Sequence, residues 1–303
     1  MKKQHYIGFI IIMLIAFRSH LEAQIDSSFT MKQNSRKAIV FSTQGVLVVG
    51  SLAYLNKAWY ADYSQSNFHF IDDSRQWLQM DKIGHFATVS MVSNLNYKAY
   101  RWAGYSNKQA TWMGVGLIWG YLATIEVMDG FSEQWGFSWY DITANTLGGA
   151  LFAAQQLTWQ DQRIIVKFSY HPTEYADMRP EVLGSTSAER ILKDYNGQTY
   201  WLSVNPQSFS ANRKIFPNWL NLAFGYSGDG MLGGSSNIGE DFDYSDIPRT
   251  RQFFFSPDID FTRIKTKSKF LNTLFVVLNL VKIPSPTLEV DQTGSVKFYW
   301  FYF

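Results

Sequence analysis

The 303-residue sequence contains no cysteine. This absence excludes a disulfide framework, and it leaves no thiol to carry a lipid behind a signal peptide. The sequence also lacks an excess of either charge, since 27 Lys and Arg stand against 25 Asp and Glu. Because nucleic acid binds to a basic field, we exclude nucleic acid as a partner. A mean hydropathy of −0.16 is too polar for a chain that lies mostly in lipid.

The first 23 residues have the parts of a cleavable signal peptide. Lys2 and Lys3 form a positive start, residues 6–17 are an apolar run, and Ala23 ends a plausible cleavage site. The apolar run is short for crossing a bilayer, and an uncleaved anchor is the alternative. Removal of residues 1–23 leaves 24 basic and 24 acidic residues, so the mature chain carries about no net charge.

Aromatic residues make up 17% of the sequence, and eight of the 11 Trp lie between Trp59 and Trp159. In this region four apolar stretches predict helices, and Asp81, Ser106 and Asp141 stand where N-caps are expected. The predicted helices cover residues 37–60, 81–102, 106–129 and 141–159. The preceding residues 24–36 are polar, and we predict a flexible segment there.

The distribution of charge bears on whether these four helices cross a membrane. Lys98, Arg101 and Lys108 lie around the second connection, whereas residues 109–162 contain no Lys or Arg. By the positive-inside rule the connection between the second and third helices would be cytoplasmic. The residues before the first helix would then be cytoplasmic too, which a cleaved signal peptide does not allow. Either the signal peptide is retained or the helices do not span. Polar residues inside the helices favour the second reading, so we expect a compact bundle that touches a membrane or sits in one leaflet.

After residue 160 the sequence changes to short alternating segments. These predict strands near residues 164–170, 198–204, 251–264 and 296–303. Residues 187–195 and 268–281 fit short helices, and residues 225–239 form a loop with six Gly. The predicted fold class is α+β, mainly α. It consists of a four-helix bundle domain of apolar, Trp- and Gly-rich helices at residues 37–160, followed by a mixed strand and helix region at residues 161–303.

Ionisable residues stand at the ends of the apolar helices. Asp81 and His85 are four residues apart, as are Asp141 and Asn145, so each pair shares one face of a helix. Glu126 lies near the end of the third helix. We predict a catalytic site of His85, Asp81, Glu126, Asp141 and Asn145, in which His85, Asp81 and Glu126 are candidate metal ligands. The alternative is a buried polar network that fixes helix register, with Asp81 and Asp141 as N-caps.

Three segments of this region resemble a known family. The DKIGHF segment (residues 81–86), residues 126–133 and residues 141–149 are similar to the YfiM-like family, described as predicted periplasmic lipoproteins of unknown function. Residues 193–201 and 221–234 resemble the long form of that family in Bacteroidetes. The resemblance implies a location in the cell envelope and gives no reaction. Residues 81–150 have a weaker similarity to VanZ-like membrane proteins.

These observations predict an exported cell-envelope protein that is periplasmic or membrane-associated. The outer membrane is one of the membranes with which it could associate. We expect it to sit at a membrane surface in a scaffolding or assembly role, with a lipid surface or an envelope protein as its partner. The alternative is a hydrolase-like, metal-dependent envelope enzyme that acts on a lipid or cell-wall precursor. The sequence leaves the cofactor and the oligomeric state open.

Overall fold

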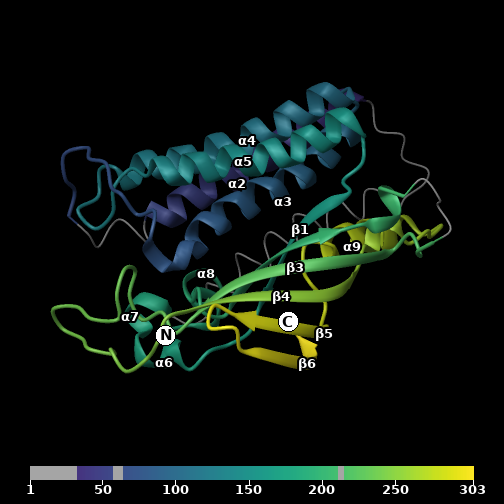
Figure 1. Cartoon of the computed structure of the whole chain (residues 1–303). Coiled ribbons are helices and arrows are strands. Elements are labelled where there is room, and N and C mark those ends of the chain that lie inside the picture. Colours follow the sequence, from purple (N-terminus) through teal and green to yellow (C-terminus); the bar gives the residue numbers. More distant parts are fainter. Residues whose placement is uncertain (1–32, 57–63, 211–214) are drawn as a thin grey trace. The chain divides into compact units, whose positions relative to one another are not determined.

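The computed structural model describes residues 33–56, 64–210 and 215–303 (Figure 1). The predicted signal peptide and residues 24–32 of the predicted flexible segment lie outside the described residues. The chain divides into two compact units. Unit 1 contains the described residues up to Ser74 together with Thr88–Asp161, and unit 2 contains Arg75–Ala87 and Gln162–Phe303. Compact units differ from domains, so the predicted domain limits stay a prediction.

Helices are present in the four regions where the sequence predicts them. They are α2 (Gln33–Leu55), α3 (Met80–Trp102), α4 (Asn107–Asp129) and α5 (Trp139–Thr158). The first two turns of α3 belong to unit 2, and its residues from Thr88 onward belong to unit 1. Ser106 caps α4 in a capping box with Gln109, as the sequence predicts.

The predicted N-cap roles of Asp81 and Asp141 are wrong. Ser138 caps α5 with its side chain, and Asp141 lies in the first turn of that helix. Asp81 likewise lies in the first turn of α3, because the 3-10 turn η2 (Gln76–Gln79) leads directly into Met80.

Helices α4 and α5 of unit 1 run side by side (Figure 1). Their buried positions mix apolar side chains such as Ile118, Leu122 and Phe152 with polar ones, which are Thr111, Glu126, Asp141, Asn145, Gln155 and Gln156. Their exposed sides carry Trp112, Val127, Trp139, Leu147 and Leu157. A helix side that faces water would be expected to carry polar and charged residues at such positions.

Helix α2 also exposes apolar side chains. Val40 is buried, and Gln44 donates to Oδ1 of Asn96 at 3.1 Å, whereas Val46 is 72% exposed. Tyr100 donates its hydroxyl to Oε1 of Gln44 at 2.6 Å. Among the described residues, α2 is the one helix long and apolar enough to cross a membrane by length and composition.

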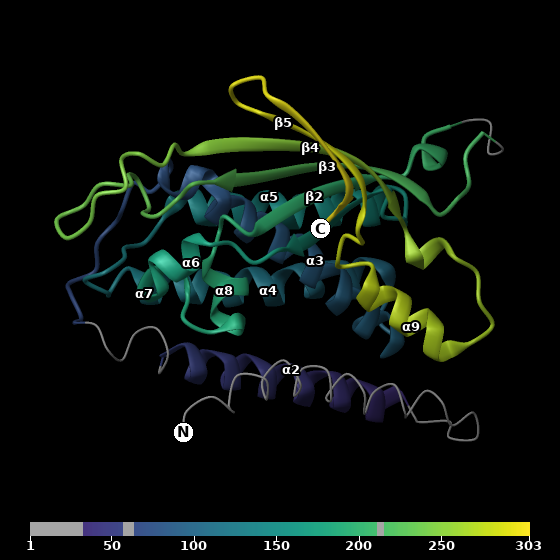
Figure 2. The ribbon, with the colours of Figure 1, turned by 90° about the horizontal axis from the view of Figure 1, so that it is seen from below.

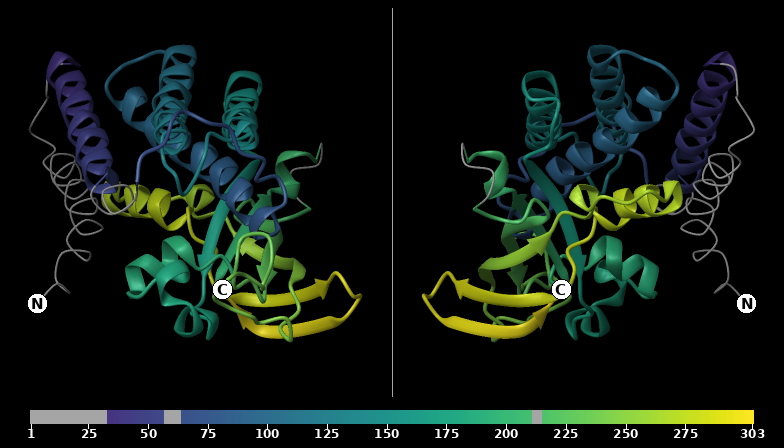
Figure 3. Two further views of the ribbon diagram at one scale, coloured as in Figure 1. Left: turned by 90° about the vertical axis from the view of Figure 1, so that its left-hand side faces the viewer. Right: turned by 90° about the vertical axis from the view of Figure 1, so that its right-hand side faces the viewer.

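Unit 2 is built on an antiparallel sheet in which strands adjacent in the chain are adjacent in space. Within the described residues its six strands are β1 (Ile164–Tyr170), β2 (Gln198–Val204), β3 (Leu220–Asp229), β4 (Thr250–Ile259), β5 (Ser285–Asp291) and β6 (Val296–Tyr302). The sheet twists so strongly that the β5–β6 hairpin runs across the direction of β1 (Figure 3). The predicted α+β, mainly α class is confirmed, and the four-helix bundle stays a prediction.

Short helices accompany the sheet. They are α6 (Tyr175–Met178), α7 (Pro180–Leu183), α8 (Ser187–Lys193) and α9 (Lys269–Leu278). The first three gather at one end of the sheet, and α9 lies at the other (Figure 2). The Gly-rich segment that begins at Gly225 is strand up to Asp229, so the predicted loop starts later than expected.

The two faces of the sheet differ in an unusual way. A row of directly paired side chains crosses five strands on one face, and every member is exposed: Leu202, Phe224, Phe255, Leu288 and Phe298. The opposite face buries polar side chains together with Trp201 and Phe254, and these include Ser203, Asn221, Ser256, Asp258 and Glu289. In an antiparallel sheet with one face on the core and the other in solvent, the apolar residues would be buried and the polar residues exposed.

A buried charge cluster lies among these polar side chains. Lys167 and Lys282 flank Asp258, and the side chains of all three are fully buried. The Lys167 ammonium lies 2.7 Å from one carboxylate oxygen of Asp258, and that of Lys282 lies 4.0 Å from the other. Burial lowers the pKa of Lys282 to about 8, with Lys167 acting in the same direction and Asp258 opposing it.

This pKa predicts a pH-dependent stability. Between about pH 8 and 10.5 the folded chain binds fewer protons at Lys282 than the unfolded chain, so the free energy of unfolding rises with pH. The rise attributable to Lys282 is at most about 3 kcal/mol. Urea unfolding at pH 7.5 and at pH 10 measures it. The Lys282→Met variant should lose this rise and the exposed control Lys267→Met should keep it, whereas an equal rise in Lys282→Met would contradict the assignment.

Candidate functional site

The predicted site residues fall into two groups. Asp81 and His85 lie in unit 2, on the first two turns of α3, whereas Glu126, Asp141 and Asn145 lie in unit 1.

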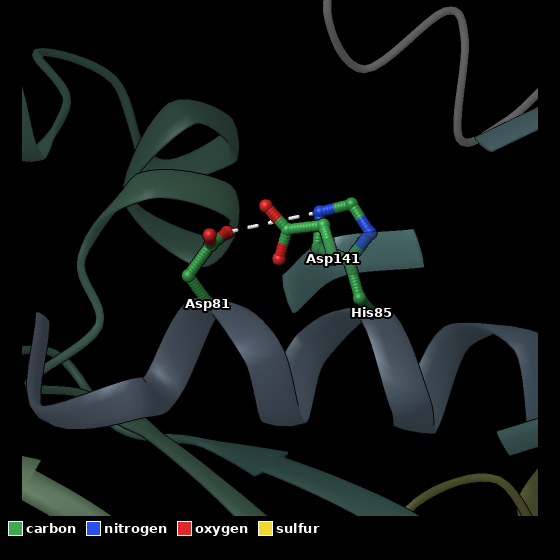
Figure 4. A group of neighbouring side chains, drawn as sticks. All are labelled: Asp81, His85 and Asp141. Atoms are coloured by element: carbon green, nitrogen blue, oxygen red, sulfur yellow. Dashed lines mark ion pairs between the residues drawn. The ribbon is translucent and has the colours of Figure 1, made fainter. Parts of the chain in front are cut away.

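Asp81 is the centre of the first group. Lys82 donates to Oδ2 of Asp81 at 2.8 Å, and the hydroxyl of Tyr195 donates to Oδ1 at 2.9 Å. Nε2 of His85, one helical turn further on, lies 3.9 Å from the same Oδ1 (Figure 4). Burial acts to raise the pKa of Asp81, but His85, Lys82 and the hydroxyl of Tyr195 outweigh it and hold the pKa below its ordinary value. Asp81 is therefore an anionic ligand or hydrogen-bond acceptor at neutral pH.

The start of α3 is held in place by the sheet of unit 2. The hydroxyl of Tyr226 donates to the carbonyl oxygen of Leu78 at 2.5 Å. A Cβ on Gly84 would lie 3.0 Å from the hydroxyl oxygen of Tyr200, so α3 approaches β2 closely at this glycine. These contacts place Asp81 and His85 relative to β2 and β3.

The backbone just before Asp81 is strained. Trp77, Leu78 and Gln79 have φ values of 49°, 49° and 65°, in the left-handed region that non-glycine residues rarely adopt. Each such residue costs about 1 kcal/mol or more, and strain of this kind clusters at functional sites. Arg251 donates to Oε1 of Gln79 at 2.7 Å and helps to hold this conformation.

The second group surrounds Ser138 in unit 1. The Ser138 hydroxyl donates to Oδ1 of Asp73 at 2.7 Å and accepts from the backbone N–H of Asp141 at 3.2 Å. The backbone N–H of Ser138 donates to Oε2 of Glu126 at 3.2 Å. All four residues are buried, and so is Asn145, one turn after Asp141. The structure thus brings Glu126 and Asp141 to one serine, together with a third carboxylate.

Ser138, Asp73 and Tyr195 are functional neighbours that the sequence reasoning missed. A signal for Ser138 exists, because a serine three residues before an acidic residue at a helix start is a capping pattern. Tyr195 and Asp73 have no such local signal, since their partners lie far away in the sequence.

The residue types suit a divalent cation. Within unit 2, Asp81 offers a carboxylate oxygen and His85 an imidazole nitrogen, and both atoms are ligands of divalent transition metals. In unit 1, Glu126, a predicted ligand, accepts a hydrogen bond from the backbone N–H of Ser138.

A family model described as "Predicted periplasmic lipoprotein (DUF2279)" matches residues 69–157. The matched segment contains every predicted site residue, and it confirms the predicted similarity to a periplasmic lipoprotein family of unknown function. It also confirms the predicted location of an exported protein that is periplasmic or membrane-associated. No curated protein and no solved structure matches the chain. The VanZ-like similarity stays a prediction, and the sequence has no cysteine for the lipid in the family's description.

The Ser138 network predicts a measurable stability difference between two N-caps. Ser138→Ala removes the cap of α5 and the hydrogen bond to buried Asp73, so it should lower the free energy of unfolding by about 2–3 kcal/mol. The matched control Ser106→Ala removes an exposed cap and should cost about 1 kcal/mol. Chemical denaturation of both variants measures the difference. Equal losses would show that the bond to Asp73 adds nothing.

Proposed function

We propose that the chain is a cell-envelope protein held at a membrane surface by unit 1, where it acts as a scaffold or assembly factor. The observation that carries the proposal is the uncharged exterior of α2 and α5. A water-facing helix side is expected to carry charged residues. Polar residues that face inward with apolar residues outside are the arrangement expected next to lipid.

Helix α5 gives the clearest case. Its exposed positions contain no charged residue, and they are Trp139, Tyr140, Thr143, Thr146, Leu147, Ala150, Ala154, Leu157 and Thr158. The acidic residue of the helix, Asp141, is buried. Exposed Trp and Tyr at a helix end suit the boundary between lipid headgroups and acyl chains.

Helix α2 supplies the second contact with lipid. Val46 and Val49 are its most exposed large side chains, and Gly45, Gly50 and Ala53 are exposed beside them. This side carries no charge over the length of the helix after Lys37. In water, this apolar side of α2 would favour aggregation. In contact with acyl chains, the same side would stabilise binding of the helix to the membrane.

Membrane fractionation with a carbonate wash tests this proposal. The wild-type chain should stay in the membrane pellet, and Val46→Lys/Val49→Lys should move to the soluble fraction, because each lysine in apolar lipid costs about 2.5 kcal/mol or more. The matched control Ile191→Lys/Leu192→Lys puts two lysines on exposed positions of α8 and should stay in the pellet. Recovery of the wild-type chain wholly in the soluble fraction would defeat the proposal.

The second candidate function is a metal-dependent, hydrolase-like enzyme acting on a lipid or cell-wall precursor. Its support is the pair formed by Asp81 and His85 within unit 2. Nε2 of His85 lies 3.9 Å from Oδ1 of Asp81, one helical turn earlier.

A carboxylate and an imidazole are ligands of the kind found in zinc and manganese sites. A divalent cation held by Asp81 and His85, with further coordination positions open, would supply a water molecule of lowered pKa.

Metal analysis of the purified chain tests the enzyme candidate. The wild-type chain should carry or take up about one equivalent of a transition metal. His85→Ala and Asp81→Asn should lose it, and His69→Ala, a histidine outside the proposed ligand set, should keep it. Thermal unfolding of each variant shows whether the fold is retained. A wild-type chain that neither carries metal nor binds added zinc or manganese would remove this candidate.

A further inference from the structure

Helix α9 of unit 2 is apolar and yet only partly covered. Seven of its ten residues are apolar, in the sequence KFLNTLFVVL. No residue of α9, all of which the structure describes, is buried, and Phe270, Leu271 and Leu278 are exposed. An amphipathic helix of this kind normally presses its apolar side onto the core of its own domain.

A basic run leads directly into this helix. Lys265, Lys267 and Lys269 are exposed, and residues 261–288 contain no acidic residue. Arg263 pairs with Asp260 at 2.9 Å, whereas no salt bridge among the described residues engages the three lysines. The segment therefore carries a local positive charge in a chain that has almost no net charge.

The segment is fastened at its base and extends from the sheet. The side chain of buried Asn279 donates to Oδ1 of buried Asp260 at 3.1 Å and accepts from the backbone N–H of Phe261 at 3.0 Å. Directly after α9, the carbonyl oxygen of Leu280 accepts from the N–H of Phe168 in β1 at 3.0 Å. Residues 261–278 thus form a fixed projection at the end of the sheet opposite α6, α7 and α8 (Figure 2).

We propose that residues 263–278 dock unit 2 on a bilayer surface with anionic headgroups. The exposed apolar residues Phe270 and Leu271 enter the boundary of the acyl chains, and the three lysines lie among the headgroup phosphates. An amphipathic helix with exposed apolar side chains beside a cluster of basic residues has the two properties that bind a peripheral helix to such a surface. Charge complementarity selects an anionic bilayer over a neutral apolar partner. This contact belongs to unit 2 and does not depend on the proposed anchoring by unit 1.

A single fluorescent label on α9 tests the docking. Because the chain contains no cysteine, Leu271→Cys gives one labelling site for an environment-sensitive fluorophore in the full chain. With phosphatidylcholine vesicles that contain phosphatidylglycerol, the emission should shift to the blue and the label should be protected from aqueous iodide. With vesicles of phosphatidylcholine alone, or in high salt, both effects should be lost. A label on Leu192→Cys, in exposed α8, should show neither effect.

Charge variants separate this contact from general adhesion. In the labelled chain, Lys265→Gln/Lys267→Gln should abolish the blue shift, and the charge-matched control Lys193→Gln/Lys297→Gln should retain it. Equal emission in neutral and anionic vesicles would overturn the proposal, and so would a label that is already protected without vesicles. A chain that is soluble after the carbonate wash and still shows the anionic response would refute the proposed anchoring alone.

Discussion

In both compact units the interior contains many side chains with hydrogen-bonding groups beside the apolar ones, and the need of these groups for partners constrains the packing. A buried polar group without a partner costs free energy on the order of a kilocalorie or more. In unit 1 Ser138 meets this need by joining Asp73, Glu126 and the backbone of Asp141. In unit 2 the hydroxyl of Ser203 donates to Asp258, which also pairs with Lys167.

The polar interior has its counterpart on the outside. Apolar residues that do not fill the core remain on the surface of α2, α5, α9 and the outer face of the sheet. A protein in bulk water rarely keeps such large apolar areas exposed. The proposed membrane contacts would cover part of this apolar surface, in agreement with the envelope location that the family match supports.

The elements with strong local signals were predictable from the sequence. Ser106 with Gln109 marks the start of α4, and alternation marks β1, β2 and β6. Strand β5 was missed because Pro284 and Pro286 precede its alternating part and its inward residues, Thr287 and Glu289, are the polar ones.

The candidate site was predictable only in part. The spacing of Asp81 and His85 implied their pairing, because residues four apart on a helix are neighbours. The association of Glu126 with Ser138 and Asp73 depends on how separate segments pack, which no local pattern contains. The left-handed residues before Met80 also have no signal, since none of them is glycine.

The assignment of residues 75–87 to unit 2 has a consequence for the order of folding. A chain that passes through a membrane N-terminus first delivers α4 and α5 well before Tyr195 and Tyr226, which bond to Asp81 and Leu78. These contacts join residues more than a hundred positions apart, whereas the strands of the sheet meet their neighbours in sequence. The first turns of α3 therefore acquire their bonds to Tyr195 and Tyr226 only after β3 has been delivered.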